Sequence, residues 1–420
     1  MPTTTHRSWR YILLLILAGE AIFILPFVLV RVFRPTVLAV YGIDNTDIGL
    51  CFSAYGFVAL GAYLLGGPLA DRFPPRKLMG TALLLTAAGG PVYAAAPSLL
   101  TLKILYGYWG FTTIFLFWAA MIKATRIWGG DKAQGRAFGL LDGGRGLTGA
   151  LISLLGVTIF GYLVGEGTGA MADSAGAFRV VVLTSSALIA GIGVLVFFFL
   201  RAGEDAERSV TVDRITMAQV RPVLRLPSVW LLMVIILCAY VGYKVTDVIS
   251  LYASDVMGYD EVGAAQTGTF LLFLRPVAGI GAGFLADLSR PSRYLIGSFT
   301  LSILGGLLFA SGWLEPGRGA FFFFTVILTA TGVYAGRALY FAVLREGRIP
   351  LALTGTAVGL ISFVGYTPDI FASLLTGYFL DTYPGAAGHY YVFYMLVGFS
   401  LVGLAAAMVF RKVTTRRIQS

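Results

Sequence analysis

Long apolar runs, separated by short polar intervals, occupy almost the whole of this 420-residue chain. Twelve runs can be distinguished, and each is close to the roughly 20 residues that a helix needs to cross the hydrocarbon core of a bilayer. Hydrophobic residues make up 57 % of the chain and charged residues 12 %, whereas soluble domains average roughly 45–50 % and about 25 %. The sequence therefore predicts an all-α integral membrane protein with twelve transmembrane helices.

The longest polar interval divides these runs into two groups of six. It covers residues 202–227 and contains several charged residues. We therefore predict a six-helix domain over residues 1–201, a cytoplasmic interdomain linker over 202–227 and a second six-helix domain over 228–420. The predicted helices lie near residues 11–30, 48–70, 78–97, 99–122, 137–163, 178–200, 228–254, 262–286, 293–314, 319–344, 354–380 and 388–410.

A short motif closes two of the runs and supports the division into halves. The first copy begins Gly67-Pro68-Leu69-Ala70-Asp71, and the second, about half the chain later, begins Gly283-Phe284-Leu285-Ala286-Asp287. In both copies a short basic turn leads into the next apolar run. A repeat at this spacing predicts two similar membrane halves. The motif residues that we expect to act in gating are Gly67, Asp71, Arg72, Arg76, Lys77, Gly283, Asp287 and Arg293.

The motif resembles the cytoplasmic loop signature between the second and third helices of the major facilitator superfamily, which has a degenerate copy between the eighth and ninth helices. The resemblance implies two pseudo-symmetric six-helix halves and secondary active transport by alternating access. It also implies that Asp71, held among Arg72, Arg76 and Lys77, latches the halves together on the cytoplasmic side. The alternative is that these basic residues only set the topology. The second copy departs from the pattern, with Ser292 in the place of Arg76.

The basic residues predict the orientation of the chain. With the N-terminus in the cytoplasm, most of the 31 Lys and Arg lie at cytoplasmic ends and loops, as the positive-inside rule requires. We therefore expect both termini in the cytoplasm. The Lys and Arg residues that set this orientation account for the formal net charge of +10. Because the charge is explained in this way, no nucleic-acid partner is expected. In this arrangement four arginines lie at the side of the membrane opposite the cytoplasm, namely Arg31, Arg34, Arg179 and Arg318.

Charged side chains inside the predicted spans are the best indication of chemistry, because an unpaired charge in lipid is costly and usually functional. Asp142 and Arg145, like Lys244 and Asp247, are three residues apart and can form a pair on one helix face. Structural pairing and substrate binding stay open as alternatives for both pairs. The candidates for substrate binding are Arg275, Glu20, Asp369, Arg337, Lys244 and Arg145.

Arg275 is the leading candidate, since it has no acidic neighbour on its own predicted helix. A guanidinium group is a planar fork that makes two charge-assisted bonds to one carboxylate. The segment Arg275-Pro276-Val277-Ala278-Gly279 resembles the eighth helix of monocarboxylate and oxalate carriers, and the resemblance implies that Arg275 grips a substrate carboxylate. The alternative is that Arg275 pairs with Asp369 or Glu20 across a cavity.

Glu20 and Asp369 are the candidates for proton coupling. A carboxyl group in an apolar cavity takes up a proton more readily, whereas a nearby Arg favours the ionised form, so cargo can switch its protonation. Glu20 stands where the monocarboxylate carriers place a lysine, which weakens that narrower assignment. The fifth predicted helix lacks the Gly-Pro signature of drug/proton antiporters, which makes drug efflux less favoured.

The chain offers little for enzyme or metal chemistry. It contains two His and two Cys, and it shows no zinc-protease, phosphate-loop or nucleophile-elbow motif. We expect no cofactor, no metal and no enzymatic activity. Cys51 and Cys238 both lie inside apolar runs, so they do not suggest a disulfide framework.

These observations together favour a monomeric, proton-coupled secondary transporter in a bacterial inner membrane. Its expected cargo is a small organic anion, either a carboxylate or a related sulfonate or phosphate ester. The alternative cargo is an amphipathic or cationic compound moved outward, for which Glu20 and Asp369 would be central. A membrane sensor built on the same scaffold, without transport, is the second class of function.

Overall fold

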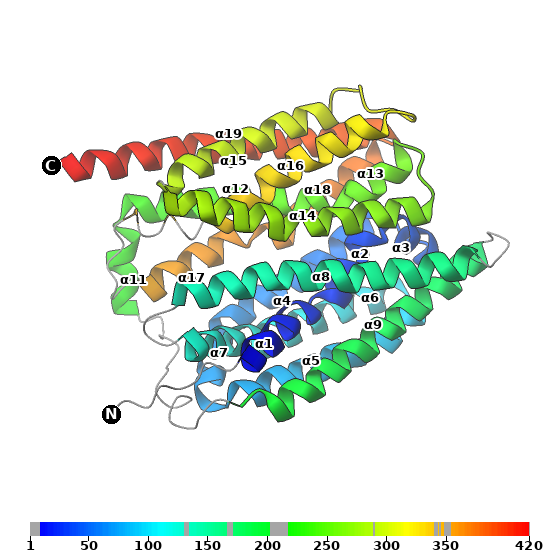
Figure 1. Cartoon of the computed structure of the whole chain (residues 1–420), viewed down its shortest axis with the longest axis horizontal. Coiled ribbons are helices and arrows are strands. Elements are labelled where there is room, and N and C mark those ends of the chain that lie inside the picture. Colours follow the sequence, from blue (N-terminus) through cyan, green and yellow to red (C-terminus); the bar gives the residue numbers. More distant parts are fainter. Residues whose placement is uncertain are drawn as a thin grey trace. The chain divides into compact units, whose positions relative to one another are not determined.

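The computed structural model describes residues 9–129, 134–165, 171–201, 217–288, 290–339, 343, 346–347 and 354–419. Within these ranges the chain is built from helices, and it contains no strand (Figure 1). Ten helical segments of the described chain are long and apolar enough to cross a membrane. The prediction of an all-α membrane protein is therefore confirmed.

The positions of the spans agree with the predicted runs. Two long helices outside the ten segments, α4 (Asn45–Arg72) and α5 (Pro75–Ala94), lie where the second and third spans are predicted. The described helices thus follow the order of the twelve predicted runs. The ten segments are Trp9–Val32, Leu99–Gly129, Ala137–Gly165, Ser174–Phe199, Pro227–Asp255, Glu261–Ala286, Pro291–Phe309, Gly319–Leu339, Leu360–Thr382 and Ala386–Thr415.

The chain packs as two compact units that do not follow the sequence halves. The first unit comprises Met1–Leu29 and Phe57–Val212, and the second comprises Val30–Gly56 and Asp213–Ser420. A segment from the first sequence half therefore packs with the second unit. The division into 1–201, 202–227 and 228–420 stays a prediction, and linker residues 202–216 lie outside the described part of the chain.

The first unit is a bundle of helices with a core of tightly packed aromatic and small residues. Trp109 packs edge-on against Tyr93, with ring centroids 5.6 Å apart, and donates from Nε1 to the Thr86 carbonyl at 3.1 Å. The indole N–H of Trp109 thus has a partner, as burial of a polar group favours. The helices are α1 (Trp9–Ala21), η1 (Ile24–Val28), the second part of α4, α5, α6 (Leu99–Gly110), η2 (Phe111–Trp118), α7 (Ala119–Gly129), α8 (Gln134–Gly165) and α9 (Met171–Phe199).

The first span changes its hydrogen-bonding pattern at Pro26. Pro has no N–H, so it cannot donate within a helix. The N–H of Leu29 bonds instead to the carbonyl of Ile24, five residues back, which makes η1 a π-helical segment. Such segments often occur at functional sites. This one ends just before the chain passes from the first unit to the second.

The second unit has close helix packing that depends on small residues. A Cβ at Gly332 of α16 would lie 2.6 Å from the backbone N of Ser302 on α15, so only Gly permits this approach in lipid. The helices are α2 (Leu29–Val32), α3 (Arg34–Tyr41), the first part of α4, α11 (Met217–Leu224), α12 (Pro227–Val245), η3 (Thr246–Val248), α13 (Ile249–Asp255), α14 (Glu261–Leu288), α15 (Pro291–Phe309), α16 (Gly319–Leu339), α17 (Thr354–Gly365), α18 (Pro368–Thr382) and α19 (Ala386–Gln419).

Candidate substrate and coupling site

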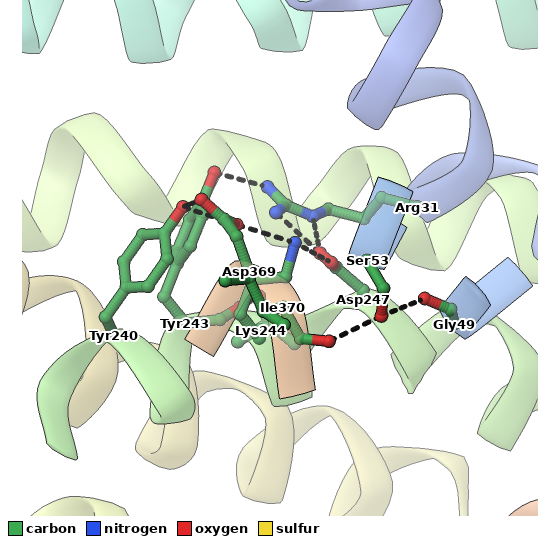
Figure 2. A network of polar contacts seen from close by, with 10 residues as sticks. Arg31, Gly49, Ser53, Tyr240, Tyr243, Lys244, Asp247, Asp369 and Ile370 are labelled. Atoms are coloured by element: carbon green, nitrogen blue, oxygen red, sulfur yellow. Dashed lines mark hydrogen bonds and ion pairs between the residues drawn. The ribbon is translucent and has the colours of Figure 1, made fainter. Parts of the chain in front are cut away.

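A cluster of charged and tyrosine side chains lies buried in the second unit (Figure 2). Its members come from separate parts of the chain, namely α2, α12, η3, α16 and α18. Burial makes such a cluster expensive unless each charge is paired or hydrogen-bonded. The contacts within the cluster therefore decide what it can do.

Arg31 and Asp247 form the shortest ion pair of the cluster. The Nε and Nη2 atoms of Arg31 both lie 2.5 Å from the Oδ1 atom of Asp247. Arg31 also donates from Nη1 to the Tyr243 hydroxyl at 3.0 Å. Both charged residues are buried, with 2 % and 4 % of their surface exposed. Charge-assisted bonds at a buried site are the strong class of hydrogen bond, so Arg31 is firmly held.

Lys244 lies between two carboxylates. Its Nζ atom is 3.4 Å from Oδ1 of Asp369 and 3.7 Å from Oδ2 of Asp247. Asp369 also accepts from the hydroxyl of Tyr240, at 3.0 and 3.1 Å. The predicted local pair of Lys244 and Asp247 is therefore confirmed, and a contact that the sequence does not predict joins Lys244 to Asp369. On its other side the Lys244 ammonium lies 4.3 Å from the ring centre of Phe52.

Tyrosine rings connect the remaining cations to this cluster. The guanidinium carbon of Arg337 lies 3.7 Å from the ring centre of Tyr243, and that of Arg31 lies 4.5 Å from the same ring. The ring of Tyr334 packs edge-on against that of Tyr243, with ring centroids 6.3 Å apart. Arg275 is buried on α14, as the prediction of an intramembrane charge requires. Tyrosine rings attract cations through their π faces, and Arg31 and Arg337 both lie against the ring of Tyr243.

The first unit contains a separate and smaller charge site. Nε of Arg145 lies 3.3 Å from Oε2 of Glu20, and both residues are buried. The guanidinium carbon of Arg145 lies 5.5 Å from the ring centre of Phe23 and 5.9 Å from that of Trp118. The side chain of Asp142 is exposed, so its pairing with Arg145 stays a prediction.

The gating motif lies mostly at helix ends. Arg72, Lys77 and Arg293 are exposed, and Arg76 is half-buried. Gly283 is an exposed residue of α14. Gly67 belongs to α4, and the side chains of Asp71 and Asp287 lie outside what the structure describes. The latch therefore stays a prediction.

Sequence reasoning missed three members of the buried cluster. The distribution of basic residues predicts only that Arg31 lies at the side opposite the cytoplasm, and its partner Asp247 lies far away in the sequence, so no local signal joins the two. Tyr240 and Tyr243 could have been found. Together with Lys244 and Asp247 they follow the spacing of three and four residues that places side chains on one helix face.

Among the described residues, no group of His, Cys, Asp and Glu could hold a metal ion.

Comparison with known proteins gives the family. The model of the family "Major Facilitator Superfamily" matches residues 12–373. The chain is 25 % identical to the inner membrane protein YqcE of Escherichia coli, over 99 % of this chain and 97 % of that protein. It is also 25 % identical to the E. coli membrane sensor protein UhpC, over 74 % and 72 %.

A solved structure gives the fold. A bacterial homologue of the human lysosomal transporter Spinster superposes with a TM-score of 0.75 over 99 % of this chain and 98 % of that chain, at 16 % sequence identity. This likeness confirms the predicted fold of the major facilitator superfamily. At this identity the comparison concerns the fold alone.

Proposed function

The chain belongs to the major facilitator superfamily, and from that premise we propose that it carries a small organic anion together with protons by alternating access. Membership indicates a membrane transporter rather than an enzyme. The anionic cargo and the proton are our proposal. So are the monomeric state and the location in a bacterial inner membrane with both termini in the cytoplasm.

The observation that carries the proposal is the gathering of cations in the buried cluster. In the described part of the second unit, Arg31, Lys244 and Arg337 share the cluster with the two carboxylates Asp247 and Asp369. Guanidinium and ammonium groups that are gathered at a low-dielectric site favour an additional anion. A carboxylate, sulfonate or phosphate ester would supply that charge.

Each cation has a distinct part in this proposal. Arg275 and Arg337 carry planar forks that match the two oxygens of a carboxylate or the several oxygens of a sulfonate or phosphate. Lys244 carries a compact ammonium on a flexible stem, so it can turn from a protein carboxylate to the cargo. Tyr243 offers its ring to Arg337 and holds the guanidinium in place.

Proton coupling follows from the double pairing of Asp369. In the structure its charge is balanced by Lys244 and stabilised by the Tyr240 hydroxyl. When cargo draws Lys244 away, a buried carboxyl that loses its cation takes up a proton more readily. Cargo and proton would then bind together, which is symport. Glu20 in the first unit is the second proton-coupling candidate, paired with Arg145.

Two other functions stay in competition. Efflux of a cationic or amphipathic compound would use Glu20 and Asp369 as its counter-ions. Ligand sensing has a specific observation in its favour, because the chain resembles the membrane sensor protein UhpC over most of its length. Both alternatives predict binding but differ in the charge of the ligand or in the flux.

A stability screen followed by a flux assay tests the proposal. Purified protein is heated with single organic anions, with lipophilic cations and with neither, since a ligand stabilises the state that it binds. We expect anions alone to raise the melting temperature, and we expect a proton gradient to drive the stabilising anion into proteoliposomes. Stabilisation by cations alone would favour efflux, and binding without flux would favour the sensor.

A further inference from the structure

A strap, which we define as residues 30–56, is held on the second unit by contacts at several points (Figure 2). Near its start, Arg31 binds Asp247, and the Ser250 hydroxyl donates to the Arg31 carbonyl at 2.6 Å. Near its end, the Ser53 hydroxyl donates to the Ile370 carbonyl at 2.5 Å. The strap is therefore tied to both α12–α13 and α18.

The middle of the strap is capped by one carboxylate. Asp381 accepts from the backbone N–H of Asn45 at 3.1 Å and from that of Thr46 at 2.6 Å, at the start of α4. A carboxylate at a helix N-terminus satisfies free N–H groups and is favoured by the helix dipole. This contact involves none of the charges of the buried cluster.

The strap also approaches the cluster through backbone packing. A Cβ at Gly56 would lie 3.0 Å from the carbonyl carbon of Asp369, so α4 and the start of α18 touch there. Phe52 presents its ring to the Lys244 ammonium. The strap and the proposed cargo site thus share two contact points besides Arg31.

The decisive feature of the cluster is that its charged groups form a chain of contacts, in which each inner group lies between two groups of opposite charge. Asp247 contacts Arg31 through Oδ1 and Lys244 through Oδ2, and Lys244 contacts Asp369 in turn. Lys244 cannot come closer to one carboxylate without weakening its attraction to the other, because Coulomb energy falls with distance. A change at Asp369 is therefore transmitted to Arg31.

We infer that Arg31, Asp247, Lys244 and Asp369 form a relay that sets how tightly the strap is held. When Asp369 is neutral, Lys244 turns toward Asp247, competes with Arg31 and loosens the strap. When an anion or Asp369 attracts Lys244, Asp247 is left to Arg31 and the strap is tight. Arg31 and Asp247 are thus positioning residues that link the cluster to the strap. The inference deepens the proposed function by adding a mechanism to the same site, but it can be tested without cargo.

The chain contains its own probe of the strap. Cys51 lies on the strap and is 3 % exposed, and the second cysteine, Cys238 on α12, is 2 % exposed. In a Cys238→Ala background the rate at which N-ethylmaleimide alkylates Cys51 reports release of the strap. The full-length protein in liposomes is the material, with no cargo added.

The relay predicts a pattern of labelling rates rather than a single change. Asp247→Asn leaves Arg31 without its carboxylate, and we expect Cys51 to react about tenfold faster or more, given the cost of removing one partner of a buried pair. Asp369→Asn should also accelerate labelling, although it removes no contact of Arg31. The double variant Lys244→Gln/Asp369→Asn removes the competitor as well, so labelling should return to the slow parental rate.

The double variant distinguishes the relay from simple loosening of the fold. If Asp369→Asn acts by disturbing packing, the double variant will label at least as fast as the single one, and the relay is wrong. Glu315→Gln is the matched control, because it removes a carboxylate of the same unit from an exposed pair with Arg318. It should label at the parental rate.

A conservative variant keeps the inference testable if a carboxylate variant fails to fold. Arg31→Lys retains the charge but loses the multiple contacts of the guanidinium group, and we expect labelling several-fold faster. Parental labelling in a folded Arg31→Lys protein would overturn the role of Arg31. Such a result would leave the anion proposal intact, since the stability screen does not depend on the strap.

Discussion

Among the described contacts, Glu20 and Arg145 of the first unit form one ion pair, whereas the ion pairs of the second unit are linked in a series. In the first unit Glu20 and Arg145 face each other among aromatic rings. In the second unit Asp247 and Lys244 each contact two charged partners. Breaking a single buried pair is costly, because it leaves a buried charge. A series can exchange partners at small cost, which is what a site that binds and releases cargo needs.

The first prediction would break this comparison most severely. Arg145→Met leaves the Glu20 carboxylate in a buried apolar site, and removing one partner of such a pair costs about 3–5 kcal/mol. We expect a large loss of folded protein, measured by the yield of monodisperse protein in detergent. Glu20→Gln added to Arg145→Met should restore much of the yield, since no unpaired charge is left. A well-folded Arg145→Met protein would show that the pair is exchangeable after all.

The second prediction concerns the cargo grip of the second unit. Arg275→Lys retains the charge but loses the planar fork, and a lost charged hydrogen bond at a desolvated site costs about 1.5–3 kcal/mol. We expect anion affinity to fall about ten- to a hundredfold, as measured by calorimetry on the stabilising anion. The matched control is Arg318→Lys, which changes an exposed Arg of the same unit.

The alternative role of Arg275 gives a different pattern. If Arg275 serves only to pair with Asp369, Asp369→Asn and Arg275→Met should damage folding equally, and the double change should restore expression. Unaltered anion affinity in a stable Arg275→Lys protein would contradict the substrate-gripping role.

The third prediction concerns the gating motif. Asp71→Asn keeps the size of the side chain and removes the charge that the superfamily pattern places among basic residues. Transport should slow several-fold while anion affinity stays within a few-fold, because the motif lies away from the buried cluster in the predicted topology. Flux and equilibrium binding measured on the same preparation separate the two effects. A large loss of affinity with normal flux kinetics would place Asp71 in the binding site.

The smallest expected effect tests the strap from its exposed side. Partial burial raises the pKa of Asp44 above its usual value, and the nearby Asp381 and Asp47 carboxylates add to this. A carboxyl with a raised pKa in the folded state lowers stability as pH rises from the unfolded to the folded pKa. Asp44→Asn should therefore raise the free energy of unfolding slightly at neutral pH, by no more than about 0.5 kcal/mol. In acid the substitution should leave the free energy of unfolding unchanged. Melting temperatures at pH 7 and at acidic pH check this, and a stabilisation that grows in acid would contradict it.

The sequence by itself determined the class of this protein. Apolar runs of membrane length can bury their backbone polar groups only as helices, so twelve runs predicted the spans without any tertiary information. The repeated Gly-x-Leu-Ala-Asp motif indicated two halves and the superfamily. The expected pair of Lys244 and Asp247 was also local, since a spacing of three residues brings the side chains together on one helix turn.

Only the tertiary structure decided which charges are partners. The pairs of Arg31 with Asp247 and of Lys244 with Asp369 join residues from distant parts of the chain, and helix periodicity says nothing about which faces meet. The association of residues 30–56 with the second unit was equally invisible, because the apolar runs of the first two spans continue across both boundaries of that segment. Side-chain packing between helices, rather than the hydropathy of any one of them, placed the strap and the charges that hold it.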